Sequence, residues 1–118
     1  MKIFTKVLKI NEHFNASEYI KAHQPENMWP ETVAALAEIE VLDMELYLHD
    51  DTIIMTMITN DDFNHDSAMA KLATLPRQAE WEAYVAQFQG ADKNQSAKDK
   101  WQPLDRIYHF KTCQEFLN

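Results

Sequence analysis

Glycine is almost absent from this chain, since Gly90 is the one glycine among 118 residues. Phosphate-cradling loops and dinucleotide fingerprints need glycines where the backbone approaches a ligand closely. We therefore expect no nucleotide cofactor. Cysteine is equally scarce: Cys113 stands alone, so no disulfide can form within the chain, and its neighbours lack the pattern typical of a nucleophile.

Basic residues are also in deficit. The chain has 11 Lys and Arg against 19 Asp and Glu, a net charge of -8, and no basic cluster. Such a surface repels nucleic acid and anionic membranes. No apolar run approaches the roughly 20 residues of a membrane span, and the amino terminus lacks the features of a signal peptide. We expect a cytoplasmic protein that binds neither nucleic acid nor membrane.

Two acidic stretches contain metal-ligand residue types. They are His49-Asp50-Asp51 and the segment 61–66, and neither has a recognised ligand spacing. The first is typical of a turn, and the second of the acidic start of a helix, which the helix dipole favours. We expect no bound metal.

The first half of the chain predicts a strand, two helices and a hairpin. Residues 2–10 have strand character, and a helix is expected from a cap at Asn15 to Gln24-Pro25, because proline disfavours helical backbone before it. A second helix opens at Trp29-Pro30-Glu31. Its predicted buried positions are Val33, Leu36 and Ala37.

Residues 41–49 alternate strictly, with Leu42, Met44, Leu46 and Leu48 on one face. Residues 52–59 are apolar on both faces, which is typical of a strand covered on both sides. The turn at Asp50-Asp51 predicts a hairpin. Helical patterns follow over 63–75 and 76–89, then a polar loop over 90–100, and a last strand over 101–110.

This order predicts a single domain over residues 1–118. Strand, helices, hairpin, helices and strand in sequence are typical of a ferredoxin-like α+β fold: a four-stranded antiparallel sheet with helices on one face. The strand 52–59 needs cover on its second face as well, and the chain has no further element to supply it. A second copy, sheet against sheet, is the simplest solution. We expect a homodimer, a dimeric α+β barrel.

Tyr19 and His23 are candidates for a site, because residues four apart on a helix project from the same face, about 6 Å apart at their Cβ atoms. Histidine suits general acid/base work on hydroxyl groups near neutral pH. A histidine packed between helix and sheet has the same spacing, so both interpretations stay open.

Tryptophans and carboxylates add to this set. An indole ring suits the C–H face of a pyranose, which makes Trp81 and Trp101 candidate substrate contacts, although Trp81 also fits ordinary core packing. Glu45, on the polar face of its strand, and Glu82 are candidate acceptors for sugar hydroxyls. Glu45 is equally explained as part of a solvated face.

The chain resembles the L-rhamnose mutarotase family over residues 5–110. The resemblance rests on five pieces in order: Tyr19-x-x-x-His23, Trp29-Pro30-Glu31, Asp43-Met44-Glu45-Leu46-Tyr47, Glu80-Trp81-Glu82 and Lys100-Trp101 before a terminal strand. The strings DMELY and EWE resemble the branch of the family assigned to L-fucose.

The resemblance implies a dimeric α+β barrel that interconverts the anomers of a 6-deoxyhexose without a cofactor. It implies that His23 is the proton donor and Tyr19 a substrate contact. Two positions depart from the rhamnose pattern: Glu82 replaces the second of two tryptophans, and Met44 replaces a tyrosine. These departures favour L-fucose over L-rhamnose.

Mutarotation needs a base at the anomeric hydroxyl and an acid at the ring oxygen, and it requires neither metal nor redox group. We assign the acid to His23 and sugar contacts to Tyr19, Glu45, Trp81 and Trp101, with Glu45 and Glu82 as candidates for the base. An L-rhamnose mutarotase, a sugar-binding module and a cofactor-free monooxygenase are the alternatives, because fold alone does not choose among them.

Overall fold

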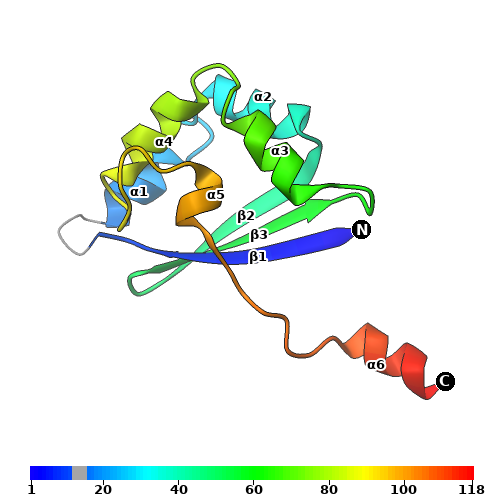
Figure 1. Cartoon of the computed structure of the whole chain (residues 1–118). Coiled ribbons are helices and arrows are strands. Elements are labelled where there is room, and N and C mark those ends of the chain that lie inside the picture. Colours follow the sequence, from blue (N-terminus) through cyan, green and yellow to red (C-terminus); the bar gives the residue numbers. More distant parts are fainter. Residues whose placement is uncertain (12–15) are drawn as a thin grey trace.

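The computed structural model describes residues 1–11 and 16–118, and its backbone follows the expected order closely (Figure 1). The elements in chain order are β1 (Lys2–Lys9), α1 (Ala16–Ala22), α2 (Pro30–Glu38), β2 (Val41–His49), β3 (Thr52–Thr59), α3 (His65–Leu72), α4 (Gln78–Ala86), α5 (Ala97–Lys100), β4 (Gln102–Pro103) and α6 (Phe110–Leu117). The helix cap expected at Asn15 lies outside the described residues. No helix in the described ranges is long and apolar enough to cross a membrane.

The sheet is antiparallel, with strand order β2-β3-β1-β4. The hairpin strands β2 and β3 pair with each other, and β3 also pairs with β1 along its whole length. Helices α1 to α5 cover one face of the sheet (Figure 1). The ferredoxin-like α+β prediction is confirmed.

The hairpin turns at Asp50, whose backbone is left-handed (φ 54°), a conformation that aspartate tolerates better than most residues. Met44 and Leu46 of β2 face the helices as predicted. Leu42 does not, because a β-bulge between Val41 and Asp43 shifts the register there and leaves Leu42 exposed.

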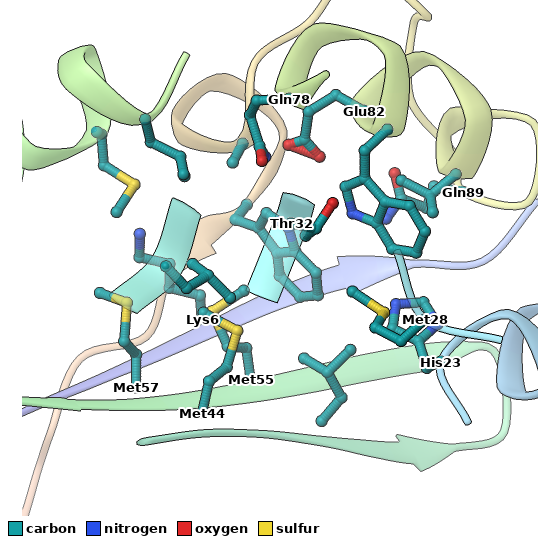
Figure 2. A pocket seen from close by; sticks show the side chains of 18 of the residues that line it. Lys6, His23, Met28, Thr32, Met44, Met55, Met57, Gln78, Glu82 and Gln89 are labelled. Carbon is teal, nitrogen blue, oxygen red and sulfur yellow. The ribbon is translucent and has the colours of Figure 1, made fainter. Parts of the chain in front are cut away.

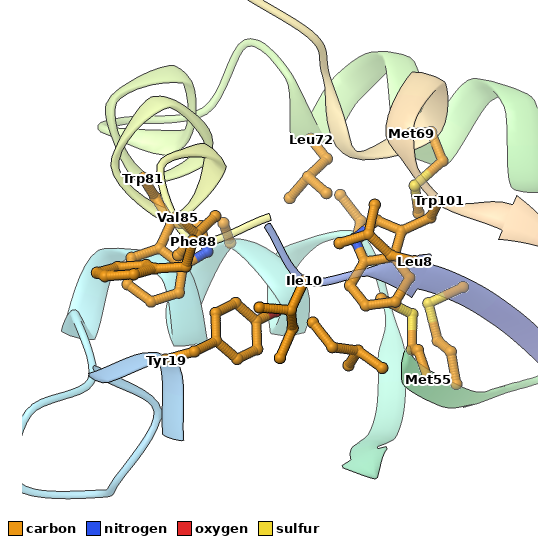
Figure 3. Close-up of a cluster of buried hydrophobic side chains, with 14 of the residues drawn as sticks. Leu8, Ile10, Tyr19, Met55, Met69, Leu72, Trp81, Val85, Phe88 and Trp101 are labelled. Carbon is orange, nitrogen blue, oxygen red and sulfur yellow. The ribbon is translucent and has the colours of Figure 1, made fainter. Parts of the chain in front are cut away.

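The core lies between the helices and the sheet (Figure 3). It joins apolar side chains from β1, β3, α1, α3 and α4, among them Leu8, Ile53, Met57, Tyr19, Leu72 and Val85. The buried positions predicted for the second helix were wrong in part. Thr32 and Ala35 are the buried residues of α2, whereas Val33 and Ala37 are exposed and Leu36 is half-buried. The helix is therefore rotated, because its contacts with α4 and β2 decide which side is covered.

The last strand predicted over 101–110 exists, but it is much shorter than predicted: β4 covers Gln102–Pro103 and pairs with β1. The pairing of β4 with β1 ends at Pro103, which has no N–H to donate. One more hydrogen bond follows, from the Leu104 amide to the Thr5 carbonyl oxygen at 2.8 Å. The chain then leaves the body of the molecule, and Phe110–Leu117 forms α6 (Figure 1). The loop expected over 90–100 contains the short helix α5.

The face of the sheet opposite the helices carries the side chains that alternate with the buried ones, and we call it the open face. Its central members are Ile3, Val7, Ile54, Thr56 and Ile58, which pair across β1 and β3. None of them is buried, and Ile3 is 60% exposed. The helices of one chain thus cover only one side of β3.

Candidate active site

A cavity of about 90 Å³ lies between the helices and the sheet (Figure 2). It continues into a more open hollow of about 390 Å³, since the two share Tyr19, His23, Met28, Leu36, Met44 and Leu46 as lining residues. Of the six site residues predicted from the sequence, five line the cavity: Tyr19, His23, Trp81, Glu82 and Trp101. Tyr19 lies on α1 and His23 directly follows it, Trp81 and Glu82 lie on α4, and Trp101 follows α5. Tertiary folding brings these segments together.

Glu45 is not among the lining residues. Its position on β2 pairs with Thr56, so it stands on the open face and is exposed. There it accepts from the Tyr47 hydroxyl and raises the pKa of that group. The single chain therefore places Glu45 outside the cavity, because strand alternation sends it to the side opposite Met44.

His23 follows the last turn of α1, where helix carbonyls lack partners within the helix. Its Nδ1 lies 2.7 Å from the carbonyl oxygen of Tyr19, and the two rings are 4.5 Å apart. A carbonyl can only accept, so Nδ1 carries the proton and Nε2 of the neutral ring is left as an acceptor. Burial lowers the pKa of His23, against the opposing effect of this hydrogen bond.

Tyr19 begins a chain of polar contacts behind the cavity. Its hydroxyl accepts from Nε2 of Gln89 at 3.2 Å, and burial raises its pKa to about 12. Lys100 donates to Oε1 of Gln89 at 2.9 Å and to the Glu82 carbonyl oxygen at 3.1 Å. The tyrosine is thus a fixed neutral hydroxyl at neutral pH.

Glu82 and Lys100 form a buried ion pair, with Lys100 Nζ 3.3 Å from Glu82 Oε1. Burial raises the pKa of Glu82, although Lys100 and Gln78 act against this, and burial lowers the pKa of Lys100. A raised pKa means that the carboxyl group keeps its proton to a higher pH than a free glutamate does, which is a property of a general acid.

Three oxygens on the helix side of the cavity are buried without a hydrogen-bond partner in the described part of the chain. They are Glu82 Oε2, Gln78 Oε1 and Thr32 Oγ1, and Figure 2 shows these side chains directed toward the cavity. Buried polar atoms without partners are rare in folded proteins. A ligand with several hydroxyl groups would satisfy them.

Trp81 forms one wall of the cavity, with Trp29 packed against it. Trp81 meets the ring of His23 edge to face, with centroids 5.4 Å apart, and packs in the same way on Trp29 at 5.2 Å. Arg77 lies 4.2 Å above the Trp29 ring and pairs with Glu31 at 3.4 Å. Trp29-Pro30-Glu31 therefore supports the wall from behind, where α2 and α4 meet.

Known proteins resemble this chain over most of its length. The family model for L-rhamnose mutarotase matches residues 4–110. The chain belongs to the L-rhamnose mutarotase family. It is accordingly an isomerase that acts on carbohydrates, a sugar mutarotase, and the resemblance seen in the sequence is confirmed.

Individual relatives agree with the family. An L-fucose mutarotase of Xanthomonas campestris pv. campestris is 30% identical over 92 residues, which cover 78% of this chain and 74% of that protein. The crystal structure of an L-rhamnose mutarotase from Formosa agariphila is similar with a TM-score of 0.69 at 16% identity, covering 93% of this chain and 99% of that one.

The same fold occurs with other chemistry. The tetracenomycin F2 cyclase from Streptomyces glaucescens, a type II polyketide cyclase, matches with a TM-score of 0.53 at 17% identity over 92% of this chain and 98% of that one. At this identity the similarity shows the fold alone. Function within the fold depends on the side chains in the cavity.

Several lining residues of this mutarotase family member were not predicted. Lys6, Thr32, Gln78 and Gln89 are buried polar residues of the cavity wall, and Lys100 holds Glu82 and Gln89 from behind. One signal was present in the sequence: Lys6 occupies the apolar side of its strand, in line with Leu8 and Ile10. No such signal marks Thr32, Gln78 and Gln89 in the sequence, because only the packing of the helices over the sheet brings them to the cavity.

The cavity is rich in methionine. Five methionines line it: Met44, Met55 and Met57 from the sheet, Met28 from the segment before α2, and Met69 from α3. Methionine is flexible and polarisable, so it adapts to an irregular apolar group. In the described ranges, no group of three or more His, Cys, Asp or Glu residues could hold a metal ion.

Proposed function

We propose that this protein is an L-fucose mutarotase, which interconverts the α and β anomers of this 6-deoxyhexose without a cofactor. Within the described part of the chain, the cavity offers unpartnered polar oxygens on its helix side and five methionines in its lining, three of them from the sheet. A 6-deoxyhexose matches both, since it combines hydroxyl groups with one methyl group. The preference for L-fucose is supported by the Xanthomonas relative and by Glu82 and Met44.

The observation that carries the mechanism is the hydrogen bond from His23 Nδ1 to the Tyr19 carbonyl. It leaves Nε2 as a proton acceptor, so in the opening step we assign His23 as the base, the reverse of the role first expected from the sequence. Glu82 takes the acid role, because burial raises its pKa. Tyr19, Trp81 and Trp101 are assigned to hold the sugar ring.

The reaction then runs as follows. His23 Nε2 takes the proton of the anomeric hydroxyl, the C1–O5 bond breaks, and Glu82 gives its proton to the ring oxygen O5. The open-chain aldehyde turns about the C1–C2 bond. Glu82 takes the proton back from O5 as this oxygen attacks the other face of C1, and His23 returns its proton to O1. Both groups end in their starting state.

The homodimer is part of the same proposal. The open face is apolar at Ile3, Val7, Ile54 and Ile58, and the segment after Pro103 carries further exposed apolar residues, including Ile107 at 96% exposure. A second copy would cover both. Pairing of the two sheets would also bring Glu45 and Tyr47 to an interface, where the carboxylate needs a polar partner.

The decisive experiment is exchange NMR of the anomeric protons. L-fucose, L-rhamnose and plain hexoses are each measured with catalytic amounts of the protein, and the spontaneous rate is subtracted. Faster exchange of L-fucose than of L-rhamnose is expected. The reverse preference would make this an L-rhamnose mutarotase, and no acceleration with any sugar would overturn the assignment.

A further inference from the structure

Lys6 is a buried lysine at the opposite side of the cavity from His23. Lys6 and Leu8 of β1, and Ile10 just after it, face the helices and are 5%, 6% and 7% exposed. Lys6 lies between methionines of β3 and α3 in the cavity wall, and Figure 2 shows it and His23 on different sides of the space. A charged side chain in an apolar row is costly unless it has a partner.

The partner that the fold supplies is a histidine. Lys6 Nζ lies 2.5 Å from Nε2 of His65, at the start of α3. In the described part of the chain no carboxylate pairs with Lys6, and the charged group that acts on it is another cation, Lys98. Burial first, and then Lys98, lower the pKa of Lys6.

His65 is itself oriented from its other side. Its Nδ1 lies 3.6 Å from Oδ1 of Asp66, which also pairs with Lys98 at 3.2 Å. A carboxylate attracts an N–H, so Nδ1 carries the proton and Nε2 accepts from Lys6. The ring is also packed on Phe4, with centroids 5.1 Å apart. His65 thus accepts one N–H of Lys6, a residue that lines the cavity, and the amine has no other hydrogen-bond partner in the described part of the chain.

We propose that Lys6 is a further ligand-binding residue, whose amine donates a hydrogen bond to a hydroxyl oxygen of the sugar on the side of the ring remote from the anomeric carbon. This rests on the proposed function. With His23 at one side and Lys6 at the other, the sugar ring binds in one orientation, with its anomeric carbon beside the imidazole. Lys6 therefore determines affinity and specificity, and takes no part in proton transfer at C1 or O5.

The variant Lys6→Met tests this, because methionine is unbranched and already forms the rest of this wall. Lys98→Met is the matched control, since Lys98 is exposed and does not line the cavity. Binding of L-fucose is followed by tryptophan fluorescence, and exchange NMR supplies KM and kcat. We expect K6M to raise Kd and KM about tenfold, the effect of one lost ligand hydrogen bond, with kcat little changed and K98M like the wild type.

A second measurement identifies the contact. L-Fucose analogues that each lack one hydroxyl group are bound to wild type and to K6M. The analogue without the contacted hydroxyl should lose affinity for the wild type and lose none for K6M, because one deletion already removes the interaction. If every analogue loses the same affinity in both proteins, the proposed contact does not exist.

The outcomes separate the two proposals. Unchanged Kd and KM in K6M would overturn the role of Lys6 and leave the mutarotase intact, whereas a wild type that neither binds nor converts any sugar would overturn both. If K6M does not fold, His65→Phe carries the test. It keeps the ring on Phe4 but removes the acceptor that positions Lys6, so an unchanged KM in H65F would contradict the proposal.

Discussion

His23 donates a 2.7 Å hydrogen bond from Nδ1 to the carbonyl oxygen of Tyr19, its neighbour one helical turn earlier. The bond uses a helix-end carbonyl to fix the tautomer of the imidazole. The same hydrogen bond thus lies at the end of α1 and leaves Nε2 of His23 as a proton acceptor in the cavity. The chemistry expected of His23 follows from this contact more than from its place in the sequence.

Replacing His23 with alanine should reduce the catalysed exchange of L-fucose anomers by about 100-fold or more, the usual contribution of a general acid/base group. Exchange NMR measures this directly. His49→Ala is the control, because this exposed hairpin histidine lies outside the cavity and should leave the rate unchanged. Equal rates in H23A and wild type would remove His23 from the mechanism.

The acid limb of the pH–rate profile should lie below pH 6.5, the ordinary pKa of histidine, because burial lowers the pKa of His23. Neutral His23 is the base, so the rate falls as pH drops through its folded-state pKa. The stability that His23 contributes has the same sign: it is present above the unfolded-state pKa and lost as pH falls. NMR titration of the imidazole should match the acid limb, and a limb at or above 6.5 would contradict the assignment.

Glu82→Gln should slow exchange and abolish the alkaline limb of the profile. Burial raises the pKa of Glu82 above 4.5, and the acid form is lost as pH rises through the folded-state value. Glutamine keeps the size of the side chain but has no proton to lose. A profile with an unchanged alkaline limb in E82Q would assign the acid to another group.

Lys100→Met should destabilise the protein by about 3–5 kcal/mol, because it removes the cation of a buried pair together with its hydrogen bonds to Gln89 and to the Glu82 carbonyl oxygen. Lys100 Nζ is 3.3 Å from Glu82 Oε1, and its side chain has no exposed area. Urea unfolding gives the free energy of unfolding. The double variant E82Q/K100M removes both charges and should recover part of the loss, whereas equal losses in single and double variants would mean that lost packing, and not the unpaired charge, causes the effect.

Ile54→Lys should convert a dimer into monomers. Ile54 pairs with Val7 and Tyr47 at the centre of the open face, where a lysine would bury its charge if a second copy covered the sheet. Analytical ultracentrifugation should give twice the chain mass of 13.8 kDa for the wild type and the single mass for I54K. Glu18→Lys, on exposed α1, is the control for charge alone. A monomeric wild type would refute the dimer.

The sequence by itself determined the elements and their order, because the alternation of 41–49, the helix stop at Pro25 and the pairing of Tyr19 with His23 are local properties. Five of the six residues that it predicts for the site line the cavity, and their roles stay a prediction. It failed where local pattern was ambiguous. The strand predicted over 101–110 ends at Pro103 in the structure, and the helix over Phe110–Leu117 was not predicted.

Only the tertiary structure decided which groups share the cavity. Lys6, Gln89 and Lys100 come from distant parts of the chain, and their roles depend on distances that no spacing in the sequence defines. Glu45 and Met44 are neighbours in sequence but lie on opposite faces of the sheet, so one stands outside the cavity and the other lines it. The shifts in the pKa values of His23 and Glu82 arise from burial, which is a property of the packed molecule and not of either residue alone.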